Sequence, residues 1–211
     1  MEKEMPMQPT RWEILQLLKR QGRATVDELA KALNMTLMGV RLHLVVLDRD
    51  GYVQRSTVRK KPGRPALVYS LTPKAEDIFP KRYDLLAEKL LESLAQQSTP
   101  SAVHRILEEA ARGLAAPLVA NVGDGSLEEK VGQVGRLLDE IGAFASWERS
   151  DGGYLIHQHN CLFYRIALRN RKVCQIDTAL LREMLGVDIQ RRDCLLDGAG
   201  KCSFFVPDSE S

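Results

Sequence analysis

The sequence predicts an α+β protein with a short tail at 1–8, an α+β domain at 9–79, helices at 80–120 and a second α+β domain at 121–211. Hydrophobic spacing is helical in the front and middle, and two β-rich runs follow the third helix. The charge is also uneven, because residues 1–80 hold 14 Lys and Arg against 9 Asp and Glu, whereas 81–211 hold 16 against 19. All four cysteines lie in the rear. A basic, cysteine-free front joined to a cysteine-bearing rear indicates separate functions.

The composition is that of a globular chain that can bury a core, since 44% of its 211 residues are hydrophobic. No run of eighteen or more apolar residues occurs, so we expect no transmembrane helix and no membrane partner. The N-terminal stretch MEKEMPMQPT lacks the apolar segment of a secretory signal. We therefore expect a cytoplasmic protein.

The front domain shows three helix starts followed by a hairpin. Thr10 with Glu13, and Thr25 with Glu28, predict capping boxes for the first two helices, and Thr36 predicts the cap of a third. Two β-rich runs follow, at 52–58 and 67–71, and they flank a basic tip rich in Pro and Gly. Three helices and a basic hairpin form the pattern of a winged helix-turn-helix.

In a winged helix-turn-helix the third helix lies in the major groove of double-stranded DNA, and the hairpin tip contacts the backbone or minor groove. We expect Arg41 to contact a base edge or a phosphate. The other outward positions near the start of this helix are Thr36, Leu37, Met38 and His43. The basic tip residues are Arg59, Lys60, Lys61 and Arg64. A basic run alone is usually a solvated loop, but this run lies where a wing is expected, and the combined pattern predicts a DNA-binding regulator.

The middle of the chain is helical. Leu86, Leu90 and Leu94 repeat at helical spacing in the segment 82–94, and a second apolar helix is predicted to run to Pro117. These helices have an ordinary explanation as core. A single reading domain contacts one half-site, however, so we expect a homodimer on a palindromic operator. The segment 121–125 is expected to be a linker.

The rear domain is predicted to mix helices and strands. Ser126 with Glu129 forms a capping box, and two strands are expected at 144–149 and 154–160. Asp177 is expected to cap a helix that ends at Gly186. A final hairpin at 188–196 and 201–206 would place Cys194 and Cys202 on opposite arms.

The four cysteines lack the spacing of a zinc ribbon or zinc finger, because no CxxC pair occurs. Cys161 ends a predicted strand, and Cys174 precedes a predicted helix. All four can therefore converge on one soft-metal site, for which thiolates suit an iron–sulfur cluster or zinc. The alternative is a set of unrelated core cysteines.

Several motifs resemble the Suf-operon repressor family, winged-helix regulators related to the arsenic-repressor and DeoR-like groups. The motifs are Val26-Asp27-Glu28-Leu29-Ala30, Val40-Arg41-Leu42-His43-Leu44, Gly63-Arg64-Pro65, His159-Asn160-Cys161-Leu162-Phe163 and Gly200-Lys201-Cys202-Ser203-Phe204. The resemblance implies that Cys161, Cys174 and Cys202, with twelve and then twenty-seven intervening residues, ligate a [4Fe–4S] cluster. It also implies repression of genes for iron–sulfur assembly. Many relatives have Pro where Leu162 stands.

The fourth ligand is left open between Cys194, which would complete an all-cysteine set, and His159, with His157 third. Either histidine has an alternative explanation as a strand residue satisfied by a neighbour. We expect the cluster to set the dimer helices at 82–117, and its loss to loosen that geometry and release DNA.

We expect no enzyme, because the sequence contains no GxxxxGK[ST], GxSxG or HExxH motif. Cys161 with His157 or His159 lacks an orienting acid or an oxyanion motif. The competing hypothesis is a regulator that senses another metal, a small organic ligand, or a thiol redox change through a Cys194–Cys202 disulfide.

Overall fold

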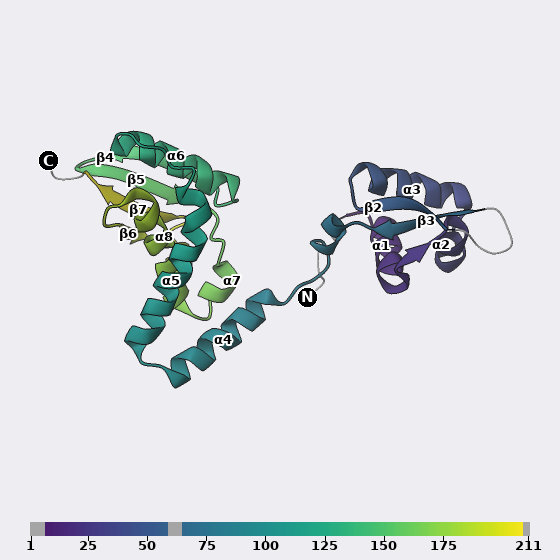
Figure 1. The fold of residues 1–211 in the computed structure, drawn as a ribbon, viewed down its shortest axis with the longest axis horizontal. Helices are drawn as coiled ribbons and strands as arrows, with labels where there is room; N and C mark the ends of the chain where they lie inside the picture. The colour runs from purple at the N-terminus through teal and green to yellow at the C-terminus, as the bar shows by residue number, and fades with distance from the viewer. Residues whose placement is uncertain (1–6, 59–64, 209–211) are drawn as a thin grey trace. The chain divides into compact units, whose positions relative to one another are not determined.

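The computed structural model describes residues 7–58 and 65–208, which fall into two units, Met1–Lys81 and Arg82–Ser211. We call them the N-terminal and C-terminal units (Figure 1). The helical region expected at 80–120 belongs to the C-terminal unit, because its second helix packs along a helix of the rear. The expected boundary at 120/121 remains a prediction.

The N-terminal unit has the winged helix-turn-helix architecture. Three antiparallel strands form a sheet in the order β1-β3-β2, and β2 and β3 are the two arms of the predicted hairpin. The elements are α1 (Pro9–Gln21), β1 (Arg23–Ala24), α2 (Val26–Leu33), α3 (Leu37–Arg49), β2 (Val53–Val58), β3 (Ala66–Leu71) and the 3-10 turn η1 (Pro73–Glu76). The sequence predicted the three helices and the two arms of the hairpin in this order, but it missed the short strand β1, which pairs with β3.

Two of the three helix starts in this unit have the side-chain caps that the sequence predicted, and one does not. Thr25 and Glu28 form the predicted capping box, and the Thr36 hydroxyl accepts a hydrogen bond from the Gly39 N–H at 3.1 Å. The predicted cap at Thr10 is wrong, since α1 already begins at Pro9. Proline at the first helical position has a suitable φ and no N–H that needs a partner.

The core of the N-terminal unit is apolar throughout its described residues. Leucines from each of the three helices are buried against Val53 and Tyr69 of the sheet. The buried leucines are Leu15, Leu18, Leu29, Leu44 and Leu47. This core fixes α3 against α2 and leaves the opposite face of α3 exposed.

The C-terminal unit combines helices with a four-stranded antiparallel sheet in the order β4-β5-β7-β6. Its helices are α4 (Tyr83–Gln97), α5 (Pro100–Val119), α6 (Leu127–Glu140), α7 (Tyr164–Ala167) and α8 (Gln175–Leu185), with 3-10 turns η2 (Arg171–Cys174) and η3 (Leu195–Asp197). Its strands are β4 (Ala145–Ser150), β5 (Gly153–Gln158), β6 (Gln190–Asp193) and β7 (Cys202–Pro207).

The main core of this unit lies on one face of the sheet. Ile156 of β5 and Phe204 of β7 are opposite each other in register and are completely buried in a cluster with residues of α6 and α8. Helix α6 approaches the sheet closely at two glycines, since a Cβ on Gly135 would lie 3.0 Å from the Trp147 ring. A second, smaller core joins α5, η2 and α8.

Two expectations for the rear need correction. Asp177 does not cap a helix, because α8 begins at Gln175 and Asp177 is buried within its first turn. The final hairpin is interrupted, because Cys194 follows β6 and leads into η3 rather than continuing a strand. In both places tertiary packing overrides a local sequence signal.

No single helix of the described residues is long and apolar enough to cross a membrane. Helices α2 and α3 reach the length and hydropathy of a membrane span only when taken together, and the pair is bent by 113° at the break between them. Both contribute buried residues to the N-terminal core.

Candidate DNA interface and cysteine site

The outward face of α3 is mostly apolar. Met38, Leu42 and Val45 are 63%, 62% and 66% exposed, and Leu37 is exposed beside them. Arg41 is exposed on the same helix. A helix with this face can offer one guanidinium to a base edge or phosphate and several apolar groups to the methyl groups of thymine.

The other predicted DNA contacts divide into three groups. The Thr36 side chain is exposed, but its hydroxyl already caps α3. His43 is half-buried, so it is less accessible than Arg41. Arg59, Lys60, Lys61 and Arg64 lie outside the described residues, and their role remains a prediction.

The four cysteines come from four separate segments of the C-terminal unit. Cys161 follows β5, Cys174 ends η2, Cys194 lies between β6 and η3, and Cys202 begins β7. None of them forms a disulfide, and all except the half-buried Cys161 are buried. The fold therefore draws residues 41 positions apart in sequence into one region.

The thiols are close enough to influence each other electrostatically. Burial raises the pKa of Cys161 to about 11, and the charges of Cys174 and Cys194 contribute to this increase. Burial likewise raises the pKa of Cys202 to about 11, with a smaller contribution from Cys194. Burial also raises the pKa of Cys174, against an opposing effect of Arg191 and Arg171. These three thiols are therefore protonated at neutral pH unless a cation replaces their protons.

As they stand, no three His, Cys, Asp or Glu side chains in the described ranges are close enough together to hold a metal ion. Three of the four cysteines lie outside helices and strands or at the end of a short 3-10 turn. Such positions can shift by small changes in backbone conformation, unlike positions inside a sheet.

Two arginines connect the cysteine-bearing segments. Arg191 donates to the Cys174 carbonyl oxygen at 3.2 Å, and Arg171 of η2 pairs with Asp197 of η3. The Leu195 N–H also donates to the Cys202 sulfur at 3.4 Å. Both guanidinium groups interact electrostatically with Cys174, so positive charge lies beside the thiols.

The two histidines proposed as alternative ligands differ from the cysteines. His157 is buried and its ring nitrogens are engaged, at 3.1 Å from Ser203 Oγ and 3.1 Å from Glu148 Oε1. This confirms the alternative explanation of His157 as a satisfied strand residue. His159 is exposed.

Asp177 is the residue of this region that the sequence analysis missed. Its side chain is buried, and among the described residues it makes no hydrogen bond or ion pair. Burial raises its pKa to about 6, against a smaller opposing effect of Arg191. Its negative charge also contributes to the raised pKa values of Cys161, Cys174 and Cys202. The sequence predicted Asp177 as a helix cap and so gave no sign of its burial, which arises from the packing of α8.

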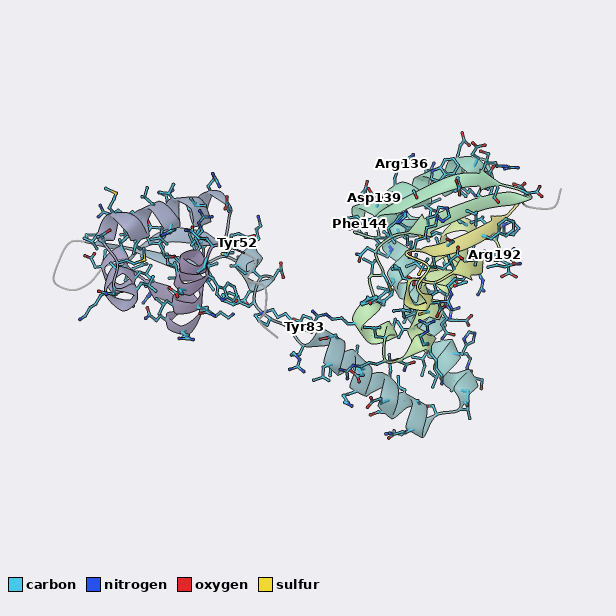
Figure 2. The ribbon with its side chains drawn as sticks, turned by 180° about the vertical axis from the view of Figure 1, so that it is seen from behind. Tyr52, Tyr83, Arg136, Asp139, Phe144 and Arg192 are labelled. Atoms are coloured by element: carbon cyan, nitrogen blue, oxygen red, sulfur yellow. The ribbon has the colours of Figure 1, made fainter. Side chains whose placement is uncertain are left out.

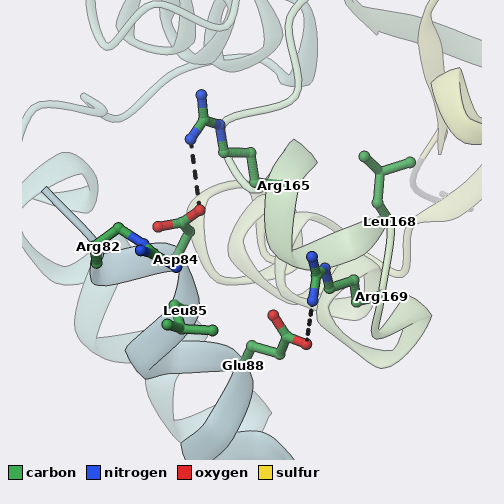
Figure 3. Close-up of a pocket in the computed structure, with 7 residues that line it drawn as sticks. All are labelled: Arg82, Asp84, Leu85, Glu88, Arg165, Leu168 and Arg169. Atoms are coloured by element: carbon green, nitrogen blue, oxygen red, sulfur yellow. Dashed lines mark hydrogen bonds and ion pairs between the residues drawn. The ribbon is translucent and has the colours of Figure 1, made fainter. Parts of the chain in front are cut away.

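The segment between Cys161 and Cys174 is joined to α4 by two ion pairs (Figure 3). Arg165 Nη1 lies 3.6 Å from Asp84 Oδ2, and Arg169 Nη1 lies 2.9 Å from Glu88 Oε1. Among the described residues of α4 Glu88 alone is buried, so its pair with Arg169 is the stronger attachment. Leu168 of the same segment lines the cavity of about 240 Å³ between the two elements.

The comparisons with known proteins define the class of the N-terminal unit. Residues 7–54 match a family described as winged helix-turn-helix DNA-binding. Within the N-terminal unit, this stretch is therefore a winged helix-turn-helix of the DNA-binding kind. No curated protein matches the chain.

Solved structures resemble the chain only in part. A transcriptional regulator homologue from Pyrococcus horikoshii OT3 is 24% identical over 44% of this chain and 91% of its own, with a TM-score of 0.32. Wild-type ZitR from Lactococcus lactis, in complex with DNA, is 24% identical over 50% of this chain and 71% of its own, with a TM-score of 0.31. The adhesin competence repressor AdcR from Streptococcus pyogenes is 23% identical over 56% and 84%, with a TM-score of 0.32.

Proposed function

We propose that the protein is a DNA-binding transcriptional repressor whose C-terminal unit holds a [4Fe–4S] cluster on Cys161, Cys174, Cys194 and Cys202. The observation that carries this proposal is that four free cysteines come from four segments to one region, where Cys161 and Cys194 each interact electrostatically with the other three. The resemblance to the Suf-operon repressors extends it to the control of iron–sulfur assembly genes.

The donor set fits such a cluster in kind, number and charge, although within the described ranges no three of its donors stand close enough together to hold a metal ion before the cysteines move. Four thiolates are its usual ligand set, and Cys194 interacts electrostatically with each of the other three cysteines. Arg171 and Arg191 offset part of the negative charge that four thiolates bring. We therefore favour Cys194 over His159 as the fourth ligand.

A bound cluster supplies the unit with an iron- and oxidation-sensitive group whose loss reports the iron–sulfur status of the cell. In this proposal, the segments of the C-terminal unit that carry the cysteines move when the cluster is bound or lost. Cys161 and Cys174 bracket the segment that carries Arg165 and Arg169, and those arginines hold α4. Because α4 is the first helix after the DNA-binding unit in the chain, a shift of this segment changes the attachment of the helix nearest in sequence to that unit.

We propose a second copy of the chain as the partner of α4. Tyr83, Leu86 and Leu90 form an exposed apolar row on this helix, 72%, 58% and 56% accessible, with Tyr83 at its first turn (Figure 2). The row recurs at helical spacing, as in helices that pair with a copy of themselves, and a dimer places two DNA-binding domains on a palindromic operator.

Anaerobic purification of the full chain, with iron and sulfide analysis and absorption spectroscopy, tests the cluster. We expect about four irons and four sulfides per chain and broad visible absorbance. Each of C161S, C174S, C194S and C202S should lose iron, whereas H159A, the matched control, should retain it. A colourless protein with stoichiometric zinc would overturn the cluster, and full iron retention in C194S would overturn the fourth ligand.

DNA binding by the holo and apo forms tests the switch. We expect the holo form to bind a selected operator more tightly than the apo form, with R41A weakening both. Equal affinity of the two forms would contradict the switch while leaving the DNA-binding domain intact. Light scattering tests the dimer, since L86D with L90D should halve a dimeric mass and E92K, also on α4, should not.

A further inference from the structure

A mostly apolar cavity of about 230 Å³ lies within the C-terminal unit, apart from the ion-paired cavity of Figure 3. Its walls come from α5, the end of α6, the turn after β5 and α8. Eight of the ten lining residues are apolar: Leu114, Pro117, Leu118, Leu138, Ile141, Leu162, Phe163 and Leu180. A cavity of this composition can hold the apolar body of a small organic molecule.

Two polar side chains complete the lining, Gln158 and Asp177. Both are buried, at 4% and 8% exposure. Within the described part of the chain neither side chain makes a hydrogen bond or a close ion pair, although Arg191 interacts with Asp177 at longer range. Buried polar groups of folded proteins almost always have partners, because an unpaired one loses its hydration without compensation. Gln158 and Asp177 are not among the fully buried orphan atoms of the described residues, so their polar atoms can pair with a molecule that enters the cavity they line.

We propose that this cavity binds a small organic cation, an apolar primary amine whose ammonium group pairs with the Asp177 carboxylate. The carboxylate accepts a charge-assisted hydrogen bond from the ammonium group, and the Gln158 amide oxygen accepts a second. The hydrocarbon body then lies against the leucines of α5 and α6. This site is additional to the cluster, and none of the four cysteines, all of which are described, lines it.

The size of the cavity limits the ligand. A water molecule occupies about 30 Å³ in the liquid, so 230 Å³ accommodates about eight non-hydrogen atoms. Benzylamine has this size and combines an ammonium group with an apolar ring. A carboxylate of the same size would meet Asp177 with like charge, and an alcohol would not supply the positive charge that the buried carboxylate needs in a partner.

The site also has a route to regulation. Leu162 and Phe163 directly follow Cys161, and Gln158 is opposite Cys202 in the register of β5 and β7. A ligand in the cavity therefore contacts residues next to two of the four cysteines. A bound ligand shifts the equilibrium between two arrangements of those segments. The size of that shift is set by the difference between its binding free energies for the two arrangements.

Titration calorimetry on the full chain at pH 7.5, with benzylamine as the probe, tests the proposal. We expect saturable one-to-one binding, with no binding of benzyl alcohol or benzoate. D177N preserves the shape of the side chain and removes its charge, and it should weaken binding roughly tenfold to hundredfold. L114W places a larger side chain in the lining, at an exposed position, and should abolish binding. D139N removes a carboxylate from the surface of α6 and is the matched control, with unchanged affinity.

Two further measurements separate this site from the cysteine site. C161S should bind benzylamine as the wild type does, and D177N should retain its iron after anaerobic purification. Absence of benzylamine binding, unchanged binding by D177N, or equal binding of benzyl alcohol would overturn the amine site. Loss of iron from D177N would also overturn it, because Asp177 would then belong to the cysteine site.

Discussion

The two units differ in where they keep their polar groups. Among the described residues, every buried polar or charged side chain lies in the C-terminal unit: Glu88, His157, Gln158, Asp177 and Ser203. The core of the N-terminal unit is apolar over the same described ranges, and the α3 face proposed to contact DNA is exposed. The first unit is therefore a scaffold that presents a surface, whereas the second keeps its chemistry inside, where burial changes pKa values and leaves groups available for ligands.

The largest expected loss of stability comes from substitutions that remove one buried side chain from the core of each unit. L44A removes a buried leucine of the N-terminal unit, and F204A removes the largest fully buried side chain of the C-terminal unit. Each should cost about 3–5 kcal/mol, because the cavity that remains is only partly filled by relaxation. Calorimetry should show two transitions, with each substitution lowering only its own. A single transition lowered by both would mean that the units unfold together.

The next largest effect is expected from D177N in apo protein. The folded-state pKa of Asp177 is about 6, above its ordinary value of 3.8, so the folded state binds the proton more tightly. The stabilisation by this proton is complete below pH 3.8 and is lost as the pH rises through 6. At pH 7.5, D177N should therefore stabilise the C-terminal unit by up to about 3 kcal/mol. Urea unfolding between pH 4 and pH 7.5 measures this difference, which should vanish at the acid end.

A smaller effect is expected at the attachment of α4. R169A leaves the buried Glu88 without its partner and should cost about 1–2 kcal/mol in the stability of the C-terminal unit. R165A removes a longer and more exposed pair and should cost less than about 0.5 kcal/mol. Hydrogen exchange along α4 distinguishes the two variants. Equal protection of α4 in both would show that the burial of Glu88 is not what holds the helix.

The smallest effects come from matched caps. Thr25 and Ser126 each form a capping box, one in each unit. T25A and S126A should each cost about 1 kcal/mol, because the same backbone donor loses its acceptor. The loss should appear only in the transition of the unit that carries the cap. A clearly larger effect at one position would indicate a tertiary role for that side chain.

The features that the sequence predicted are those that depend on residues close together in the chain, and the ones it missed depend on residues far apart. The capping boxes at Thr25 and Ser126, and the two wing strands, depend on neighbours within a few residues, so spacing alone predicted them. The environment of Asp177 depends on α5, α6 and β5, which are distant in sequence, and a capping preference concealed it. The cavity could not be predicted for this reason. The spacing of the cysteines suggested their gathering, but not which buried carboxylate would accompany them.

The apolar face of α3 has a thermodynamic consequence for DNA binding. If Met38, Leu42 and Val45 leave water on contact with DNA, as proposed, the heat capacity of the system falls and the binding enthalpy becomes more favourable as the temperature rises. Because this helix releases few counterions, its share of the affinity is insensitive to salt. The protein should thus retain more of its affinity at high ionic strength than a regulator whose recognition helix carries mainly lysine and arginine.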